Sequence, residues 1–205
     1  MFKKADNRAF TLVELLITMT IASFLMLVSV FNFGTFNDRL SVSSASQELA
    51  IAIRQAQTYG LNVRQTGVGS GGFNSAYGIY FNAETDNTRY YIFADLDTDT
   101  VYDVGNGCGS LNTECIEAVT FRDGVRISEV CAIVSGVEEC PPNAAARYLH
   151  VTFLRPNPDA EINFTNNGGN IFYFASWPNA KIVLVSRRGV EYNVSLEDTG
   201  QVYVN

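Results

Sequence analysis

The sequence has little charge, one histidine and no motif typical of an enzyme. Charged residues make up 17% of the 205 residues and hydrophobic residues 47%, a composition that excludes general disorder and can form a packed core. No stretch has the pattern of a nucleophile elbow, a zinc-binding helix or a phosphate-binding loop, and no motif gives His150 a cysteine or serine partner. We therefore expect no enzymatic activity and no resident cofactor, and we interpret His150 as structural.

Basic residues are also scarce. The chain has 14 Lys and Arg against 21 Asp and Glu, a net charge of −7; the first nine residues carry +2, which leaves −9 for the rest. An acidic body argues against a general attraction to nucleic acid or to anionic lipid headgroups. The net charge does not exclude a local basic patch. Arg187 and Arg188 can form one, although two adjacent arginines in a turn are more often ordinary surface.

No small-residue cleavage site follows the longest apolar run, as one would in a secretory signal. This run covers residues 10–33 and contains one formal charge, Glu14. As a helix its 24 residues span about 36 Å, enough to cross a hydrocarbon core of about 30 Å. Basic residues precede the run, so the positive-inside rule predicts a single-pass protein with a cytoplasmic N-terminus and the bulk of the chain outside.

The helix is predicted to continue as an amphipathic segment over residues 34–65. Gly34 is a weak spot where it can bend. One apolar stripe recurs at steps of three and four, with Ser46 among the polar residues between its members. The stripe consists of Val42, Ala45, Leu49, Ala52, Ala56 and Tyr59. A glycine-rich connector, residues 66–73, then leaves the helix and enters a strand, the reverse of the order in a phosphate-binding loop.

The rest of the chain lacks a second amphipathic helix, so parallel β-α-β units are not expected. Short runs of aromatic and branched residues predict strands instead, and residues 186–189 read as a hairpin turn. The candidate strands are residues 77–81, 89–95, 118–122, 125–134, 147–154, 160–164, 180–186, 190–196 and 201–204. We predict an α+β fold: a leader (1–9), a transmembrane and assembly helix (10–33), its amphipathic continuation (34–65) and an antiparallel β-rich head (66–205) packed on the helix.

The cysteines lack the close C-x2-C pairs of zinc sites. Cys108 and Cys115 are separated by six residues, and Cys131 and Cys140 by eight. This spacing favours two local disulfides, Cys108–Cys115 and Cys131–Cys140, over four reduced thiols, provided that the head lies in an oxidising compartment. Four cysteines allow three pairings, which the sequence alone does not resolve.

An acidic loop is the one candidate metal site. Carboxylates at alternate positions can converge on Ca²⁺ together with a carbonyl and one further oxygen. The ligands would be Asp95, Asp97, Asp99, the Val101 carbonyl and Asp103. Thr100 stands where such a loop has glycine, and Asn106 where it has glutamate. The alternative interpretation is an acidic, solvated β-turn.

Residues 10–16, Phe-Thr-Leu-Val-Glu-Leu-Leu, strongly resemble the N-terminal signature of type IV prepilins and pseudopilins. The resemblance implies cleavage by a prepilin peptidase between Ala9 and Phe10, and N-methylation of Phe10; the family normally has glycine at the place of Ala9. A charge at membrane depth is expensive and usually has a specific partner. In a filament, Glu14 can pair with the amine of a neighbouring Phe10 and fix the axial register of the helices. The alternative is a glutamate that snorkels to the bilayer edge.

Residues 49–57, Leu-Ala-Ile-Ala-Ile-Arg-Gln-Ala-Gln, and residues 199–204, Thr-Gly-Gln-Val-Tyr-Val, resemble, more loosely, the helix and the closing strand of the H-type minor pseudopilins (the GspH/FimT group). This resemblance covers most of the chain. Some members of that group bind DNA through arginines after the last glycine, but Gln201 and Tyr203 stand there in this chain. The resemblance implies a minor pilin or pseudopilin of a type IV pilus or a type II secretion-like filament. Its partners would be other pilin subunits, the prepilin peptidase, the inner-membrane assembly platform and the membrane itself. The rivals are a major pilin of the shaft and a membrane-anchored ligand-binding or DNA-binding head.

Overall fold

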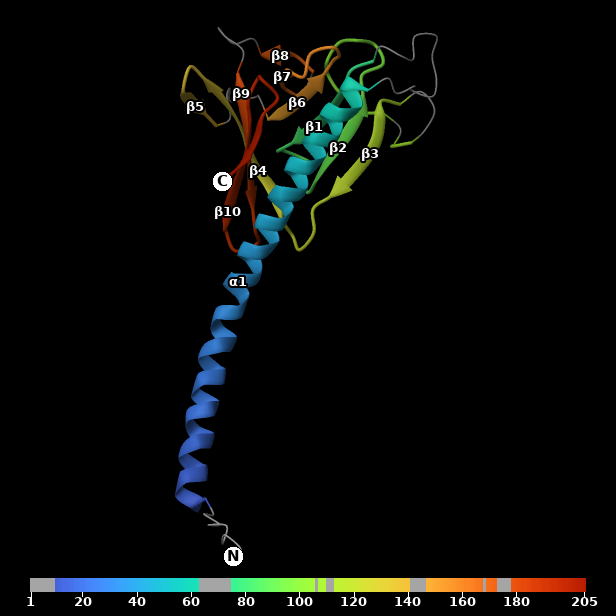
Figure 1. The fold of residues 1–205 in the computed structure, drawn as a ribbon. Coiled ribbons are helices and arrows are strands. Elements are labelled where there is room, and N and C mark those ends of the chain that lie inside the picture. Colours follow the sequence, from blue (N-terminus) through green and yellow to red (C-terminus); the bar gives the residue numbers. More distant parts are fainter. Residues whose placement is uncertain are drawn as a thin grey trace, which may run out of the picture. The chain divides into compact units, whose positions relative to one another are not determined.

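The computed structural model describes residues 10–62, 75–105, 107–109, 113–140, 147–167, 169–172 and 178–205, without the side chains of 30–33. These residues belong to two compact units, one that ends at Asn37 and one that begins at Asp38. Among the described residues, α1 is the helix, and the strands of the second unit are antiparallel (Figure 1). The predicted α+β class, a long apolar helix packed on antiparallel sheets, is confirmed.

Helix α1 covers Leu12–Leu61 as one element of 50 residues. It runs through Gly34 without a break, so the weak spot predicted there does not end the helix. The leader, the connector 66–73 and the helix end predicted beyond residue 62 lie outside the described residues.

The predicted apolar stripe is the buried face of α1. Five of its six residues are buried in the core and Tyr59 packs on the core's edge. The structure adds Ile53, which is fully buried. Ser46, one of the polar residues between the members of the stripe, is fully buried, so the buried face is wider than the stripe. Its hydroxyl donates to the Ser43 carbonyl at 2.8 Å, so the buried oxygen keeps a hydrogen bond.

The strands form two antiparallel sheets. The first has the order β3-β2-β1-β6-β7-β8 and the second the order β11-β10-β9-β4-β5. The first sheet consists of β1 (Tyr77–Asn82), β2 (Arg89–Ala94), β3 (Cys115–Thr120), β6 (Tyr148–Phe153), β7 (Ala160–Thr165) and β8 (Ile171–Phe172). The second consists of β4 (Arg126–Val134), β5 (Val137–Glu139), β9 (Asn179–Val185), β10 (Glu191–Leu196) and β11 (Val202–Val204).

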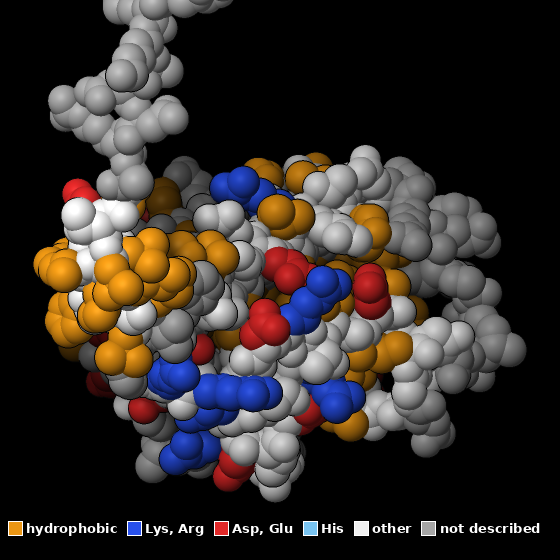
Figure 2. Space-filling view, turned by 90° about the horizontal axis from the view of Figure 1, so that it is seen from below, with side chains coloured by type: hydrophobic (Ala, Val, Ile, Leu, Met, Phe, Trp, Pro, Cys, Tyr) orange, Lys and Arg blue, Asp and Glu red, His pale blue; other side chains and the backbone are white. Residues whose placement is uncertain are grey.

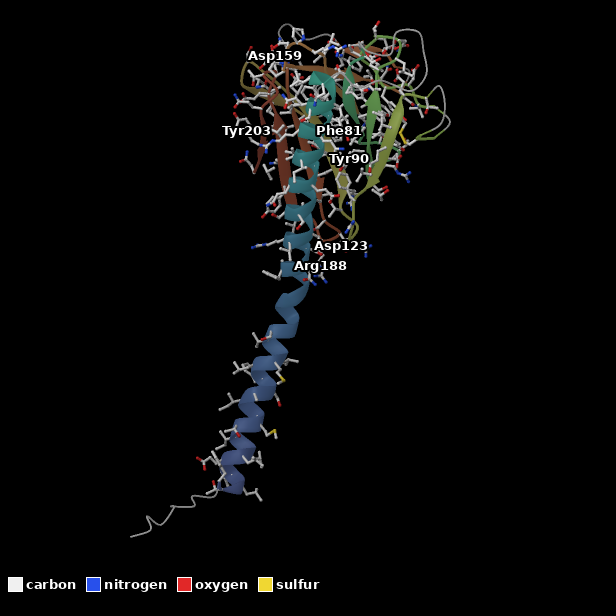
Figure 3. The ribbon with its side chains drawn as sticks, turned by 45° about the vertical axis from the view of Figure 1, so that its right-hand side comes forward. Phe81, Tyr90, Asp123, Asp159, Arg188 and Tyr203 are labelled. Carbon is white, nitrogen blue, oxygen red and sulfur yellow. A yellow bond between two sulfur atoms is a disulfide. The ribbon has the colours of Figure 1, made fainter. Side chains whose placement is uncertain are left out.

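The main core lies between α1 and both sheets. Alternation along a strand sends neighbouring side chains to opposite faces. In β1, Ile79 and Phe81 therefore join the main core, whereas Tyr80 joins a second, smaller cluster. Figure 3 shows Phe81 and Tyr90 near α1.

The strand predictions differ from the structure in few places. Strand β3 begins at Cys115, three residues before the predicted start, and β5 and β8 were not predicted. With three and two residues, these strands are too short to show an alternating pattern. The hairpin turn at 186–189 is confirmed: the Ser186 amide donates to the Val190 carbonyl at 2.9 Å, and Gly189 takes a φ of 81°.

Candidate assembly site

The first turn of α1 is closed by Thr11, which precedes the helix. The Thr11 hydroxyl accepts a hydrogen bond from the Glu14 amide at 3.2 Å, and its own O–H points at the Glu14 carboxylate at 3.5 Å. The Thr11 carbonyl accepts the first helical bond from the Leu15 amide at 3.1 Å. Thr11 is therefore the N-cap, and Glu14 stands at the position that the acidic residue has in a capping box, with its carboxylate facing the Thr11 hydroxyl.

The sequence analysis did not identify Thr11. The signal was present, because Thr-x-x-Glu before an apolar run is the spacing of a capping box. The capping role matters for Glu14, since a negative side chain in the first turn also interacts favourably with the helix dipole. Glu14 thus has a local structural role besides the intermolecular one predicted from the sequence.

The helix around this turn exposes its apolar residues. Side chains from Phe10 to Val28 are exposed, with Phe10 at 76% and Leu12 at 78%. The hydroxyl groups in this stretch have internal partners: Thr18, Thr20 and Ser23 donate to backbone carbonyls three or four residues earlier at 2.8–2.9 Å. Ser29 does the same. A helix whose polar groups are satisfied internally can leave water for lipid at low cost.

Within the part of the chain that the structure describes, α1 is the one helix long and apolar enough to cross a membrane. The prokaryotic N-terminal methylation motif matches residues 4–30, the segment that contains Glu14 and most of the apolar run 10–33. The motif indicates a type IV pilin-like or pseudopilin precursor. Comparison with curated proteins and with solved structures finds no match.

Pilin-like precursors are structural proteins. The motif implies that this chain is a substrate of the prepilin peptidase, that it is anchored in the membrane and that it interacts with other pilus subunits. Cleavage between Ala9 and Phe10 stays a prediction, since Ala9 lies outside the described residues.

The head of this pilin-like chain contains two disulfides. Cys108 is bonded to Cys115 and Cys131 to Cys140, with Cα–Cα distances of 4.5 and 4.4 Å. These are the two pairs that the sequence analysis favoured. Cys115 and Cys131 are buried, and their partners are exposed. The first disulfide closes the loop that contains Glu114, and the second ties β5 to β4 in the other sheet.

The acidic loop is folded around two buried carboxylates. Asp95, 1% exposed, accepts the Thr98 amide at 2.7 Å and the Thr100 amide at 3.1 Å. Glu114, 6% exposed, accepts the backbone amides of Leu96 and Asp103 at 2.9 and 2.8 Å. Burial raises the pKa of Glu114 to about 7, although these two amide bonds lower it. Burial also raises the pKa of Asp95.

Three of the five predicted calcium ligands lie close together. One oxygen from each of Asp95, Asp97 and Asp99 lies within 4.8 Å of the others. Asp103 is not a member of this group, and its backbone amide donates to Glu114. The Val101 amide donates to Asp99 at 2.8 Å, a bond typical of an acidic turn. The arrangement suits both interpretations of the loop, and calcium binding stays a prediction.

Calcium binding predicts a rise in thermal stability of the full chain in detergent when Ca²⁺ replaces a chelator. At 10 to 100 times the dissociation constant, the free energy of unfolding should increase by about 1–3 kcal/mol. Asp97→Asn with Asp99→Asn should remove the shift, whereas Asp159→Asn with Asp198→Asn, which neutralises two acidic residues elsewhere, should keep it. An equal melting temperature with and without Ca²⁺ would leave the solvated turn as the correct interpretation.

His150 lies in the second cluster, on the face of the first sheet opposite the main core. Its ring is 4.8 Å from that of Tyr80, and the imidazole is 2% exposed. The Tyr102 amide donates to His150 Nδ1 at 2.9 Å, so Nε2 carries the proton and donates to the Thr165 hydroxyl at 2.9 Å. Burial lowers the pKa of His150 to about 3. His150 thus attaches the acidic loop to the sheet as a neutral acceptor, in agreement with a structural role.

Proposed function

We propose that this chain is a minor pilin or pseudopilin, a structural subunit of a type IV pilus or a type II secretion-like filament. It is held in the cytoplasmic membrane with its N-terminus inside, trimmed before Phe10, and then moved by the assembly platform into a filament core. The proposal is supported above all by the apolar segment 12–29 of α1, which is exposed along its length and whose one carboxylate, Glu14, lies in the capped first turn.

Anchoring in lipid alone does not explain why a carboxylate stands in the apolar segment, because a charge at membrane depth is costly. Apolar helices pack in a membrane or a filament core by van der Waals contact, which hardly opposes sliding along the axis. A buried ion pair has a defined position, and losing either partner leaves an unpaired charge. Glu14 of one subunit and the Phe10 amine of its neighbour therefore supply the register that the apolar surface lacks.

The minor role, and the likeness to the GspH/FimT group, rest on the long helix, the glycine-rich sequence of residues 66–73 and the antiparallel sheets of the described part of the head. A major pilin of the shaft is the nearest rival. The amount of this chain in sheared filaments separates the two, because a shaft subunit dominates their protein content and a minor subunit does not.

Mass spectrometry of the N-terminus tests the proposal. Chain isolated from membranes that contain the prepilin peptidase is expected to begin at N-methylated Phe10. Ala9→Gly places the residue usual for the family before the cleavage site and should be processed at least as completely as the wild type. If both chains keep residues 1–9, the proposed filament role is wrong.

A further inference from the structure

Three segments of the chain meet at the end of the head where α1 begins to pack on the sheets. The Ser41 hydroxyl donates to the Asp123 carboxylate at 3.3 Å. The Asp38 carboxylate lies 3.8 Å from the Arg188 guanidinium. These contacts join α1 to the β3–β4 turn and to the β9–β10 turn, and Figure 3 shows Asp123 and Arg188 together beside α1.

Exposed arginines gather at this end. In the paired strands β4 and β9, Arg126 stands opposite Val185, and the Arg187 side chain lies against Gly124. Seen from below, several Lys and Arg side chains form a group on this face of the head, with single acidic side chains between and beside them (Figure 2). We name this surface the arginine base; it consists of Arg39, Arg122, Arg126, Arg187 and Arg188, all exposed.

The arginine base has the opposite charge to the rest of the head. Residues 38–205 contain eleven Lys and Arg against nineteen Asp and Glu, and five of those eleven are in the base. In the segments 38–41, 121–126 and 186–190 the acidic residues are Asp38 and Asp123, so these segments carry a net charge of +3. The net charge of the chain conceals this surface, because its members are far apart in the sequence.

One member of the arginine base is close in sequence to the predicted membrane span. Arg39 follows the end of the apolar run, Phe33, by six residues, which is about 9 Å of helix. The headgroup region on each side of the hydrocarbon core is about 5–8 Å thick. A long arginine side chain at this position therefore reaches the headgroups, and the contacts of Asp38 and Ser41 hold the two arginine-bearing turns beside it.

We propose that the arginine base docks on anionic phospholipid headgroups of the membrane that anchors α1. Guanidinium groups bind phosphate oxygens through paired hydrogen bonds, and each basic residue near an anionic surface strengthens binding about fivefold. Docking holds the head against the bilayer before the subunit is extracted. The inference rests on membrane anchoring by α1 and does not depend on which filament the subunit joins.

Folding after translocation makes such a surface compatible with the predicted orientation. The positive-inside rule counts basic residues near the ends of the membrane span. Among the five arginines only Arg39 is near the span in sequence; the other four reach it when the turns pack on α1. The three basic residues that precede the span, Lys3, Lys4 and Arg8, still determine the orientation.

The test uses the full chain, one molecule per lipid nanodisc, in phosphatidylcholine alone or with about 30% phosphatidylglycerol. Hydrogen exchange is followed in segments 121–126 and 186–190. We expect exchange about fivefold slower with phosphatidylglycerol, and about 0.5 M salt should remove the difference.

Two matched double variants decide whether the arginine base is responsible. Arg122→Gln with Arg126→Gln lowers the net charge of the three segments from +3 to +1 and keeps the Asp38–Arg188 contact; it should remove most of the lipid effect. Arg147→Gln with Arg155→Gln removes two charges elsewhere on the head and should preserve it. Equal exchange in both lipids, or an equal loss in both variants, would overturn the docking proposal while anchoring stands. A chain that does not enter nanodiscs would overturn anchoring, and docking with it.

Discussion

Glu14→Gln is expected to enter the membrane normally and to be incorporated into filaments at least tenfold less than the wild type. The substitution preserves the length of the side chain and removes its charge, so the amine of a neighbouring Phe10 stays unpaired among apolar helices. Breaking a buried pair in this way costs about 3–5 kcal/mol, equivalent to a factor of more than 100 if each subunit makes the contact once. The measurement is the ratio of this chain in sheared filaments to that in membranes.

Thr11→Ala is the matched control, because it removes the N-cap of the same turn and leaves the carboxylate. Loss of a cap costs about 0.5–2 kcal/mol, so incorporation should fall much less than in Glu14→Gln. If both variants lose incorporation equally, Glu14 acts mainly through the capping box. If Glu14→Gln is incorporated like the wild type, the carboxylate does not hold the register of the filament.

Local patterns predicted much of the fold. The 3.6-residue period identified the buried face of α1 because a helix with one face in water buries a single stripe, and the period is visible over five turns. The turn at 186–189 was also predictable from a local signal, because glycine readily adopts the left-handed conformation that Gly189 has there.

The missed features depend on how distant segments meet. The second cluster brings Tyr91, Tyr102, Tyr148 and His150 around Tyr80, and no local pattern fixes the strand register that places Tyr80 opposite both Tyr91 and His150. Of the arginine base, the sequence revealed the adjacent pair Arg187 and Arg188; Arg39, Arg122 and Arg126 were missed for the same reason. The Thr11 cap is different, because its spacing was readable and only its role beside Glu14 was overlooked.

The His150 environment predicts opposite pH responses in two variants. With its pKa lowered to about 3, His150 contributes stability above its unfolded pKa near 6.5 and loses it as the pH falls below that value. At pH 4.5 the loss is about 2–3 kcal/mol. The raised pKa of Glu114, about 7, has the opposite sign: its destabilising effect is greatest above pH 7 and disappears as the pH falls toward 4.5. His150 and Glu114 both hold the acidic loop. Because their pKa values are shifted in opposite directions, their contributions to the free energy of unfolding change in opposite directions between pH 6.5 and 4.5.

Denaturant unfolding of the full chain in nanodiscs at pH 7.5 and pH 4.5 separates the two contributions. His150→Asn keeps an acceptor near the Tyr102 amide and removes the titrating ring; relative to the wild type it should gain about 2–3 kcal/mol on acidification. Glu114→Gln should shift by a similar amount in the other direction. If a variant differs from the wild type by the same free energy of unfolding at both pH values, the substitution disturbs packing and the group does not titrate differently in the folded state. Equal slopes in all three proteins would mean that His150 and Glu114 titrate as they do in the unfolded chain. Opposite slopes would show that the acidic loop is held to the sheet by a histidine kept neutral, balanced against a carboxylate kept buried.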